Sequence, residues 1–328
     1  MAQEELCYFH IFYMVKIIKE GTKIDMKATR QSYGEALVEL GKENEKIVVL
    51  DADLANATKT IEFAKEFPQR FFDIGIAEAD MIGTAAGMSL CGKIPYASTF
   101  AVFAAGRTYD QIRSSVCYPN LNVKICATHA GVTVGEDGAT HQMLEDISLM
   151  RVLPNMKVFC PSDDVETKWI IKEISKIQGP CYVRLCRLAT PDIYDENQKF
   201  EIGKMVQIGE GTDATIFATG VVVTEALKAQ KMLQEKGIDI RVIDVHTIKP
   251  LDEEMILKCA KETKRLISIE DHSILGGMGS AISEVLTEKY PTKLERMGIN
   301  DKFGKSGKAE ELLKYFGIDA ETIIAKFL

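Results

Sequence analysis

The chain has 328 residues, of which 46% are hydrophobic and 27% charged, and this is enough for two complete globular cores. Its net charge of −8 excludes a global positive field of the kind that draws nucleic acids or anionic membranes to basic proteins. A phosphorylated ligand would therefore need a local group of basic side chains.

The eight cysteines lie mostly in apolar runs and show neither a Cys-x-x-Cys pair nor a cysteine–histidine metal spacing. We therefore expect reduced thiols in the core, a cytoplasmic location and no metal held by this chain's own residues.

The first 25 residues differ from the rest. Their apolar run, residues 7–18, is too short to span a bilayer and is followed by no small-residue cleavage site. The triplet Lys19-Glu20-Gly21 can be encoded by a bacterial ribosome-binding sequence a short distance before Met26. We expect translation to start at Met26, which makes residues 1–25 a non-native or disordered extension. The alternative is a short helix at a membrane surface or an interface.

From Met26 onward, apolar strands alternate with helices of amphipathic period. Helices are expected at 30–43, 60–67, 77–92, 102–118, 141–153 and 165–177, and strands at 46–54, 70–76, 94–99, 121–128, 156–161 and 181–187. The strands are short, nearly continuous apolar runs, as in a sheet that helices cover on both faces. This alternation predicts an α/β domain with a doubly wound parallel sheet over residues 26–190.

A polar, proline-containing stretch over 188–204 marks a boundary, with an edge strand and a linker at 191–204. A second, smaller α/β unit is expected over 205–328, with strands at 214–220, 239–245, 265–271 and 293–299, helices between them and two further helices at the end. Its Gly-Gly-Met-Gly-Ser run (276–280) is similar to a phosphate-binding loop, although close helix packing is the favoured explanation.

The segment Thr128–Gln142, THAGVTVGEDGATHQ, is the most informative part of the chain. It follows a predicted buried strand and holds three glycines and two of the five histidines, His129 and His141. Glycine lets the backbone approach a ligand closely, and histidine exchanges protons near neutral pH. A binding or proton-transfer loop is therefore favoured over a surface turn with two incidental histidines.

Further candidate residues stand at strand ends, and each has a structural alternative. Glu78 begins a helix, where a carboxylate is favourable electrostatically in any case. Arg187 can bind a phosphate through its planar guanidinium or form a strand-end salt bridge. Phe100 and Phe103 by themselves indicate core positions. The two carboxylates of Asp51–Asp53 are weak metal candidates and more typical of helix capping.

In chain order, these segments resemble the C-terminal half of a transketolase. The resemblance runs from Met26 to the end and rests on DADL (51–54), IGIAEADM (74–81), PYASTFAVF (95–103), GEDGATHQ (135–142), MKVFCPSDD (156–164), VRLCR (183–187), DVHTIKPLDEE (244–254) and IEDHSILGGMGSAISEVL (269–286). GEDGATHQ is its most specific part. The family's Gly-Asp-Gly metal motif is absent, so the chain resembles the C-terminal subunit of a split, two-chain transketolase.

The resemblance implies a thiamine diphosphate site. Glu78 would be catalytic, bonding a ring nitrogen of the aminopyrimidine and promoting ylide formation. Phe100 and Phe103 would stack on that ring, and Asp53 would lie near the thiazolium. The diphosphate, with its Mg²⁺ or Ca²⁺, would be held mainly by the partner.

The resemblance also implies a sugar-phosphate site. His129 would contact the sugar hydroxyls and help to move a proton, and Asp137 would select the configuration of one hydroxyl. His141 and Arg187 would bind the terminal phosphate. Where many family members have a phosphate-binding serine, this chain has Asn56, which is the candidate replacement.

The implied activity is transfer of a two-carbon ketol unit between sugar phosphates, as in the pentose phosphate pathway. The implied partner is an N-terminal transketolase subunit in a dimer of heterodimers, without nucleic acid or membrane. Three different functions stay open: the beta subunit of a 2-oxo-acid dehydrogenase, a deoxyxylulose-phosphate-synthase-like enzyme, and a non-catalytic paralogue that only binds a partner.

Overall fold

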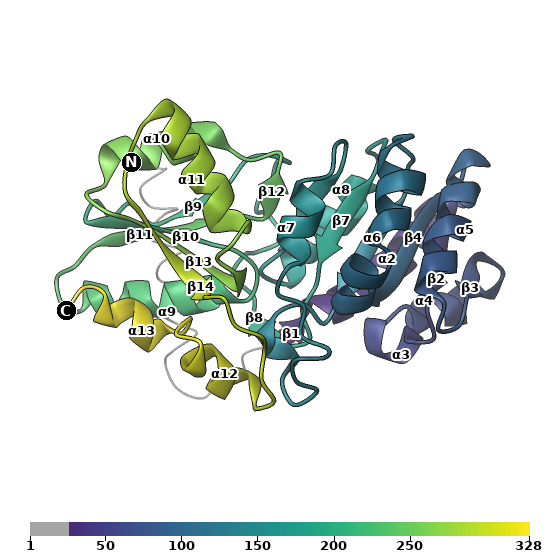
Figure 1. The fold of residues 1–328 in the computed structure, drawn as a ribbon, viewed down its shortest axis with the longest axis horizontal. Helices are drawn as coiled ribbons and strands as arrows, with labels where there is room; N and C mark the ends of the chain where they lie inside the picture. Colours follow the sequence, from purple (N-terminus) through teal and green to yellow (C-terminus); the bar gives the residue numbers. More distant parts are fainter. Residues whose placement is uncertain (1–25) are drawn as a thin grey trace.

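The computed structural model describes residues 26–328, so the expectations for residues 1–25 lie outside the described part. Two α/β lobes lie side by side, the first coloured purple to teal and the second green to yellow (Figure 1). The first is built on a seven-stranded sheet and the second on a five-stranded sheet. The predicted fold class, two α/β units with parallel sheets, is confirmed; the domain limits at 190 and 205 stay a prediction.

Six parallel strands form most of the first sheet. Its order is β12-β6-β7-β5-β4-β2-β3, in which the parallel members are β2 (Ile47–Asp51), β3 (Phe71–Asp73), β4 (Ile94–Phe100), β5 (Lys124–Thr128), β6 (Lys157–Phe159) and β7 (Cys181–Arg184). Strands β2, β5 and β7 are buried at every position, which explains why their sequences are apolar except at the strand ends.

Alternate residues of these strands enter two different cores. Along β2, Ile47 and Val49 join one core, while Val48 and Leu50 join the other. The first core is closed by α2 (Thr29–Glu43), α4 (Ile61–Glu66) and α8 (Asp164–Ile174). The second is closed by α5 (Glu78–Leu90), α7 (Asp146–Arg151) and the segment 102–117. The sheet is therefore covered on both faces, as a doubly wound fold requires.

Two helix predictions differ from the structure. The helix expected over 102–118 is two π-helical segments, η2 (Val102–Arg107) and η3 (Ile112–Cys117), on either side of the short α6 (Tyr109–Gln111). The helix expected over 141–153 starts only at Asp146, because the side chain of Gln142 is held by backbone groups of the loop before it and of the second lobe. Tertiary hydrogen bonds override the helical period there.

The second sheet has the order β14-β13-β10-β11-β9. Four of its strands, β10 (Ala214–Ala218), β11 (Ile240–Asp244), β13 (Leu266–Ser273) and the edge strand β14 (Leu294–Ile299), run parallel, and β9 (Val206–Ile208) forms the other, antiparallel edge. The helices are α9 (Val222–Gln234), α10 (Glu253–Glu262), α11 (Met278–Lys289), α12 (Ala309–Tyr315) and α13 (Ala320–Ala325). The edge strand expected before residue 204 is β8 (Ala189–Pro191), which pairs with β1 (Met26–Ala28).

One strand of the second half crosses into the first sheet. β12 (Thr247–Lys249) follows β11 directly and pairs antiparallel with β6. The Nζ of Lys249 donates to the carbonyls of Arg151 (2.9 Å) and Leu153 (2.6 Å), at the C-terminal end of α7. A cation at this position is favourable for the helix dipole and satisfies free carbonyls. Through β12 the two lobes are joined, which local sequence patterns did not predict.

Two carboxyl groups are fully buried where the lobes meet. The Ser162 hydroxyl lies 2.9 Å from Glu166 Oε2 and 2.7 Å from Asp244 Oδ2, and the Tyr194 hydroxyl donates to the same Asp244 oxygen at 2.8 Å. Burial raises the pKa of Asp244 to about 7. Burial and the nearby Asp244 and Asp163 raise the pKa of Glu166. The interface between the lobes thus holds protons that an unfolded chain would release at lower pH.

We expect Asp244→Asn to change how stability depends on pH. A folded-state pKa above the unfolded value near 3.9 means that the wild type loses stability as pH rises from about 4 through about 7, by ~1.4 kcal/mol per unit of pKa difference. Asparagine keeps the shape and an acceptor oxygen but does not ionise. The stability of the variant relative to wild type should therefore grow over this range and level off above it, as measured by urea unfolding.

Asp213→Asn is the matched control. This carboxylate accepts hydrogen bonds from Lys264 and from the amide of Asp239, and these contacts lower its pKa, so the variant should gain nothing as pH rises. A difference between Asp244→Asn and wild type that stays constant with pH would contradict a raised pKa for Asp244.

Candidate functional site

The candidate residues of the first lobe gather at one edge of its sheet. Phe100 ends β4 and is paired with Thr128, which ends β5. His129 follows β5 directly, and Arg187 lies three residues beyond the end of β7, the next strand in the sheet. The carboxyl ends of parallel strands meet at one edge, which is where open α/β sheets bind ligands. The topology therefore brings together residues that are far apart in the chain.

Four rings form a compact cluster at this edge. Phe100 stacks on His129, with ring centroids 3.8 Å apart, and lies nearly parallel to Phe103 at 5.9 Å. The His141 ring lies at a steep angle to both phenylalanines, at 6.3 Å from Phe100 and 5.8 Å from Phe103. The phenylalanines thus present flat faces beside two imidazoles, which suits the stacking of a planar ligand ring.

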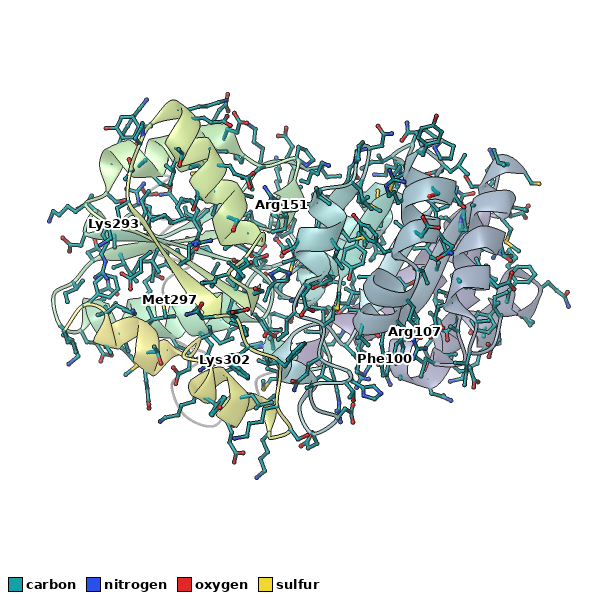
Figure 2. All side chains as sticks on the ribbon, viewed as in Figure 1. Phe100, Arg107, Arg151, Lys293, Met297 and Lys302 are labelled. Atoms are coloured by element: carbon teal, nitrogen blue, oxygen red, sulfur yellow. The ribbon has the colours of Figure 1, made fainter. Side chains whose placement is uncertain are left out.

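Glu78 lies beside this cluster with a partner that the sequence did not reveal. Glu78 is the first residue of α5 and is 5% exposed. The Nη1 of Arg107 donates to Glu78 Oε1 at 2.9 Å, and the guanidinium carbon lies 4.1 Å from the centroid of Phe103. Phe100 and Arg107 are labelled close together on the first lobe in Figure 2. Arg107 follows the predicted aromatic pair by four residues, a spacing that offered the only local signal.

His129 is held in one tautomer. The Nη1 of Arg30 lies 3.2 Å from His129 Nε2, and a guanidinium only donates, so Nε2 accepts. The proton is therefore on Nδ1, which lies 2.9 Å from Thr128 Oγ1. Burial, together with Arg30, Arg187 and His141, lowers the pKa of His129 to about 3. His129 is thus a neutral imidazole whose Nε2 lone pair accepts from Arg30.

We expect ¹⁵N spectra of histidine-labelled protein to show His129 as the neutral Nδ1–H tautomer throughout the range from about pH 5 to 8. Arg30→Ala removes the donor and a nearby positive charge, so the pKa of His129 should rise in this variant. His272, which is buried in the second lobe and has a pKa lowered to about 4 chiefly by burial, serves as the internal reference and should not respond. Ordinary titration of His129 near pH 6.5 in the wild type would refute this description.

Two arginines converge beside His129 and form a local basic group on an acidic chain. Arg30, in the first turn of α2, donates to the carbonyl of Ala57 at 3.0 Å. Within residues 26–328, it forms no ion pair with a carboxylate, and its Nε is buried without a partner. Burial and the nearby charge of Arg187 lower its pKa. An orphaned donor of this kind fits an anionic ligand. Arg30 was not predicted from the sequence, because its only local signal is a place at a helix start.

Arg187 makes two contacts within the chain and stays partly exposed. Its Nη1 donates to the carbonyl of Val134 at 2.7 Å and lies 3.3 Å from Asp137 Oδ2. The salt-bridge alternative is therefore present in part. Both side chains of this pair are more than a third exposed, and such pairs contribute little to stability. A phosphate can replace Asp137 as the partner of Arg187 at small cost.

The remaining candidates lie at the margin of the cluster. Asp53, in an exposed position with φ 60°, donates its amide to Asp73 Oδ1 at 3.1 Å. Asn56 is exposed in α3 (Ala55–Thr58), next to the carbonyl that Arg30 binds. Asp51 is fully buried and accepts hydrogen bonds from Leu54 N, Thr58 Oγ1 and Thr60 Oγ1. Asp51 therefore holds this loop, but it does not cap α3, whose N-cap residue Leu54 makes no side-chain capping hydrogen bond.

The second lobe shapes the loop over 129–142. Asp271, in β13, accepts hydrogen bonds from Val132 N at 2.9 Å and Thr133 Oγ1 at 3.1 Å. The Nε2 of Gln142 donates to the carbonyls of Val132, Gly135 and Lys305, and its Oε1 accepts from Lys305 N at 2.8 Å. Gly131 adopts φ +79°, and a Cβ there would collide with the carboxylate of Asp271. The loop conformation therefore depends on contacts that span 139 and 163 positions of the chain.

A buried ion pair anchors the same loop. The Nε of Arg184 donates to Asp146 at 2.9 Å, and its Nη2 donates to the carbonyls of Asp271 (2.7 Å) and Met143 (3.3 Å). Tyr182 donates to Asp146 at 2.9 Å. Burial alone would lower the pKa of Arg184, but its neighbours Asp146, Cys160, Asp271 and Tyr182 together outweigh burial and raise the pKa.

We expect Gly131→Ala to destabilise the chain and loosen this loop. The substitution strains a positive-φ position and forces Asp271 aside, at a combined cost of about 1–3 kcal/mol. Gly92→Ala is the control, since it has φ +80° but open space around its Cβ, and so reports backbone strain alone. Hydrogen exchange should accelerate over 131–142 in the first variant only. Equal effects of both variants would show that the contact with Asp271 is unimportant.

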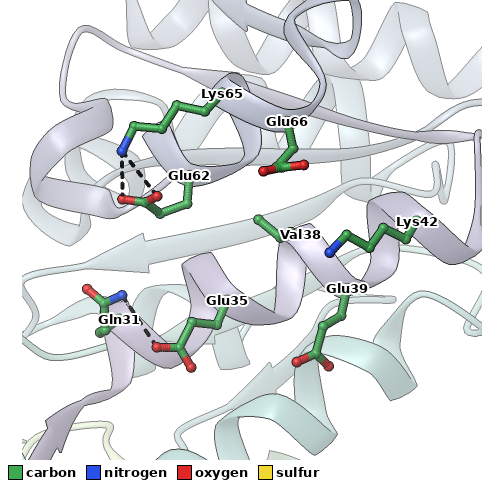
Figure 3. Close-up of a pocket in the computed structure, with 8 residues that line it drawn as sticks. All are labelled: Gln31, Glu35, Val38, Glu39, Lys42, Glu62, Lys65 and Glu66. Atoms are coloured by element: carbon green, nitrogen blue, oxygen red, sulfur yellow. Dashed lines mark hydrogen bonds and ion pairs between the residues drawn. The ribbon is translucent and has the colours of Figure 1, made fainter.

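Two more features carry no ligand chemistry. At the Gly-Gly-Met-Gly-Ser run, the Glu270 carboxylate already accepts from Met278 N (2.7 Å) and Gly279 N (2.9 Å), which supports helix packing over a phosphate loop. A groove of about 350 Å³ between α2 and α4 is shown in Figure 3. Its charged lining has four carboxylates and two lysines, so it does not suit an anionic substrate; it comprises Gln31, Glu35, Val38, Glu39, Lys42, Glu62, Lys65 and Glu66.

Neither a metal cluster nor a membrane span is found in the described range. Among residues 26–328, no three His, Cys, Asp or Glu side chains are arranged to hold a metal ion. In the same range, no helix is long and apolar enough to cross a bilayer.

Comparison with known proteins gives consistent matches over both lobes. The transketolase pyrimidine-binding domain profile matches residues 25–192, and the transketolase C-terminal domain profile matches residues 203–323. A Methanocaldococcus jannaschii protein described as a transketolase C-terminal section is 52% identical, over 92% of this chain and 96% of its own length. A 6-deoxy-6-sulfo-D-fructose transketolase subunit of a Clostridium species is 41% identical, over 92% of this chain and 94% of its own. A solved split-gene transketolase, described as an inactive beta4 tetramer, has a TM-score of 0.85 and 51% identity, over 91% of this chain and 96% of that one.

Proposed function

Because the chain belongs to the transketolase family, we propose that it is the C-terminal subunit of a two-chain transketolase, which transfers a two-carbon ketol unit from a ketose phosphate to an aldose phosphate. The observation that carries this proposal is the convergence, at one sheet edge, of a buried carboxylate, a stacked aromatic pair, a neutral histidine and two arginines. This set combines the chemistry of a planar cofactor ring with that of a phosphorylated substrate.

The family implies thiamine diphosphate, and the residues present fit its aminopyrimidine. A flat heteroaromatic ring needs an aromatic face and an acceptor in its plane, which Phe100, Phe103 and Glu78 offer. Each stacking contact is worth about 0.5–1.5 kcal/mol. When bound, the cofactor supplies a thiazolium carbon that stabilises a carbanion. Glu78 would hold and exchange a proton at a ring nitrogen, and Asp53 would stand at the edge nearer the thiazolium.

The diphosphate and its Mg²⁺ or Ca²⁺ are assigned to a separate N-terminal subunit. The basic group of Arg30 and Arg187 lies beside His129 and is proposed for the substrate, not for the diphosphate. The exposed face of α5, with Gly83, Gly87 and Leu90, is proposed as part of the assembly surface, in a dimer of heterodimers. Ala85, Ala101, Ala104 and Ala105, by contrast, are buried in this chain's own core.

Sugar phosphates would bind between the rings and the arginines. Arg30, Arg187 and His141 would hold the phosphate, with Asn56 at its rim. Asp137, released from Arg187, would bind a sugar hydroxyl. Once Arg30 turns to the phosphate, His129 Nε2, which carries no proton of its own, would accept a hydrogen bond from a reacting hydroxyl. A bound dianion between the arginines would offset their charge and raise the basicity of His129 during the reaction.

A sulfonated ketose is the second candidate substrate. A guanidinium pair binds a sulfonate as well as a phosphate, and the 41% identical relative is described as acting on 6-deoxy-6-sulfo-D-fructose. A 2-oxo-acid dehydrogenase subunit and a non-catalytic paralogue gain no support from the two arginines or from the relatives.

We expect the isolated chain to show no ketol transfer and the reconstituted complex, with thiamine diphosphate and Mg²⁺, to be active on phosphorylated ketoses. Glu78→Gln in this complex should lower turnover by about two orders of magnitude, because glutamine cannot exchange the proton. Coupled-enzyme kinetics would measure this. Full activity of the single chain, or wild-type turnover of the variant, would disprove the proposal.

Arg187→Ala should raise KM for a phosphorylated ketose by roughly ten- to hundredfold, the equivalent of a charge-assisted bond of about 1.5–3 kcal/mol, while kcat changes little. Hydroxypyruvate is the control donor, since it has no phosphate and should be used equally well by both proteins. A sulfonated ketose distinguishes the two substrate classes directly. An equal loss with hydroxypyruvate would show that Arg187 is structural.

A further inference from the structure

We propose that Arg107 occupies the place of the cofactor's aminopyrimidine in the free subunit, and that cofactor binding requires Arg107 to move aside. The inference rests on the proposed function, because it assigns the pyrimidine to Glu78 and Phe103. It concerns a positioning residue that governs access to this site.

One guanidinium engages both groups that the pyrimidine needs. The Nη1 of Arg107 donates to Glu78 Oε1 at 2.9 Å, which is the carboxylate offered to the ring nitrogen. Its Cζ lies 4.1 Å from the centroid of Phe103, the distance of a stacked contact. A planar ring at this position cannot share the Phe103 face or the Glu78 oxygen with Arg107, so occupancy by the two is mutually exclusive.

The guanidinium of Arg107 and the aminopyrimidine ring are chemically alike. A guanidinium is a flat, delocalised N–C–N unit with N–H donors in its plane, and it stacks on aromatic faces while bonding a carboxylate edge-on. An aminopyrimidine protonated at its ring nitrogen has the same arrangement of an in-plane donor and two π faces. Arg107 therefore satisfies the buried carboxylate of Glu78 in the way that the cofactor ring would. Without such a partner, the buried charge would be costly.

The contact between Arg107 and Glu78 can be exchanged for a contact between Glu78 and the cofactor ring. Arg107 is 54% exposed on its side chain, whereas Glu78 is 6% exposed, so the cation can leave for water while the carboxylate stays. Arg107 also ends the π-helical segment η2, directly after the exposed Gly106, whose surroundings are open. The incoming ring takes over the hydrogen bond to Glu78, so the exchange leaves no buried charge unpaired. Competition should therefore weaken cofactor binding by a modest factor and not abolish it.

The test measures binding of thiamine, which carries the pyrimidine without a diphosphate, to the isolated full chain by calorimetry or ligand-observed NMR. Arg107→Met keeps the apolar stem and removes the guanidinium, so affinity should rise by roughly three- to tenfold. Arg107→Lys keeps the charge but not the planar stack and should fall between Met and wild type. Adding Glu78→Gln to Arg107→Met should abolish the gain.

Arg113→Met is the matched control, an exposed arginine of the neighbouring segment η3, and should not change the affinity. An affinity of Arg107→Met equal to or below that of wild type overturns the inference. If thiamine binds the isolated chain too weakly to measure, the Kd of thiamine diphosphate in the complex decides, with the same expected order.

Failure of the inference is distinguishable from failure of the proposed function. If the complex binds thiamine diphosphate, depends on Glu78 and is indifferent to Arg107→Met, only the placeholder role is wrong. If Glu78→Gln leaves cofactor affinity and turnover unchanged in the complex, the site assignment itself is wrong, and the inference falls with it.

Discussion

The buried pair of Arg184 and Asp146 is the contact on which the arrangement of the site depends. Its two charges are almost inaccessible to solvent, and each is satisfied by the other and by neighbouring polar groups. Because Arg184 also binds the carbonyls of Asp271 and Met143, one guanidinium joins the end of β7, the start of α7 and the second lobe. Removing either charge would leave the other unpaired in the interior, which is far more costly than the pair is worth.

This anchoring explains why the two lobes form one functional unit. The second lobe contributes no residue to the ring cluster, yet its Asp271 and the backbone at Lys305 set the course of the loop that carries His129 and His141. The strand β12 adds a further connection by extending the first sheet. The C-terminal lobe therefore acts as a scaffold for chemistry that takes place in the first.

Charge is organised locally against the sign of the whole chain. Arg30 and Arg187 lie close enough that each disfavours a further positive charge, and His129 responds by staying neutral. The unfavourable proximity of two cations is what a dianionic ligand relieves, so this repulsion in the free site is a source of affinity. At Glu78 the buried charge is negative, and the guanidinium of Arg107 compensates it in the free chain. The half of the site around Arg30 and Arg187 therefore favours an anionic group, and the half around Glu78 favours a cationic or hydrogen-bond-donating one.

The sequence by itself determined the strands, the alternation with helices and the placing of Phe100, His129 and Arg187 at strand ends. Apolar runs report burial directly, and the ends of parallel strands share an edge by topology. Tertiary structure alone decided the partners. Arg30 meets His129 across 99 positions, and Arg107 meets Glu78 across 29. Tertiary contacts also delay the start of α7 to Asp146 and place β12 in the first sheet. Local periodicity shows which face of an element is buried, but not what it is buried against. Pairings between distant polar groups therefore appear only when the whole chain is packed.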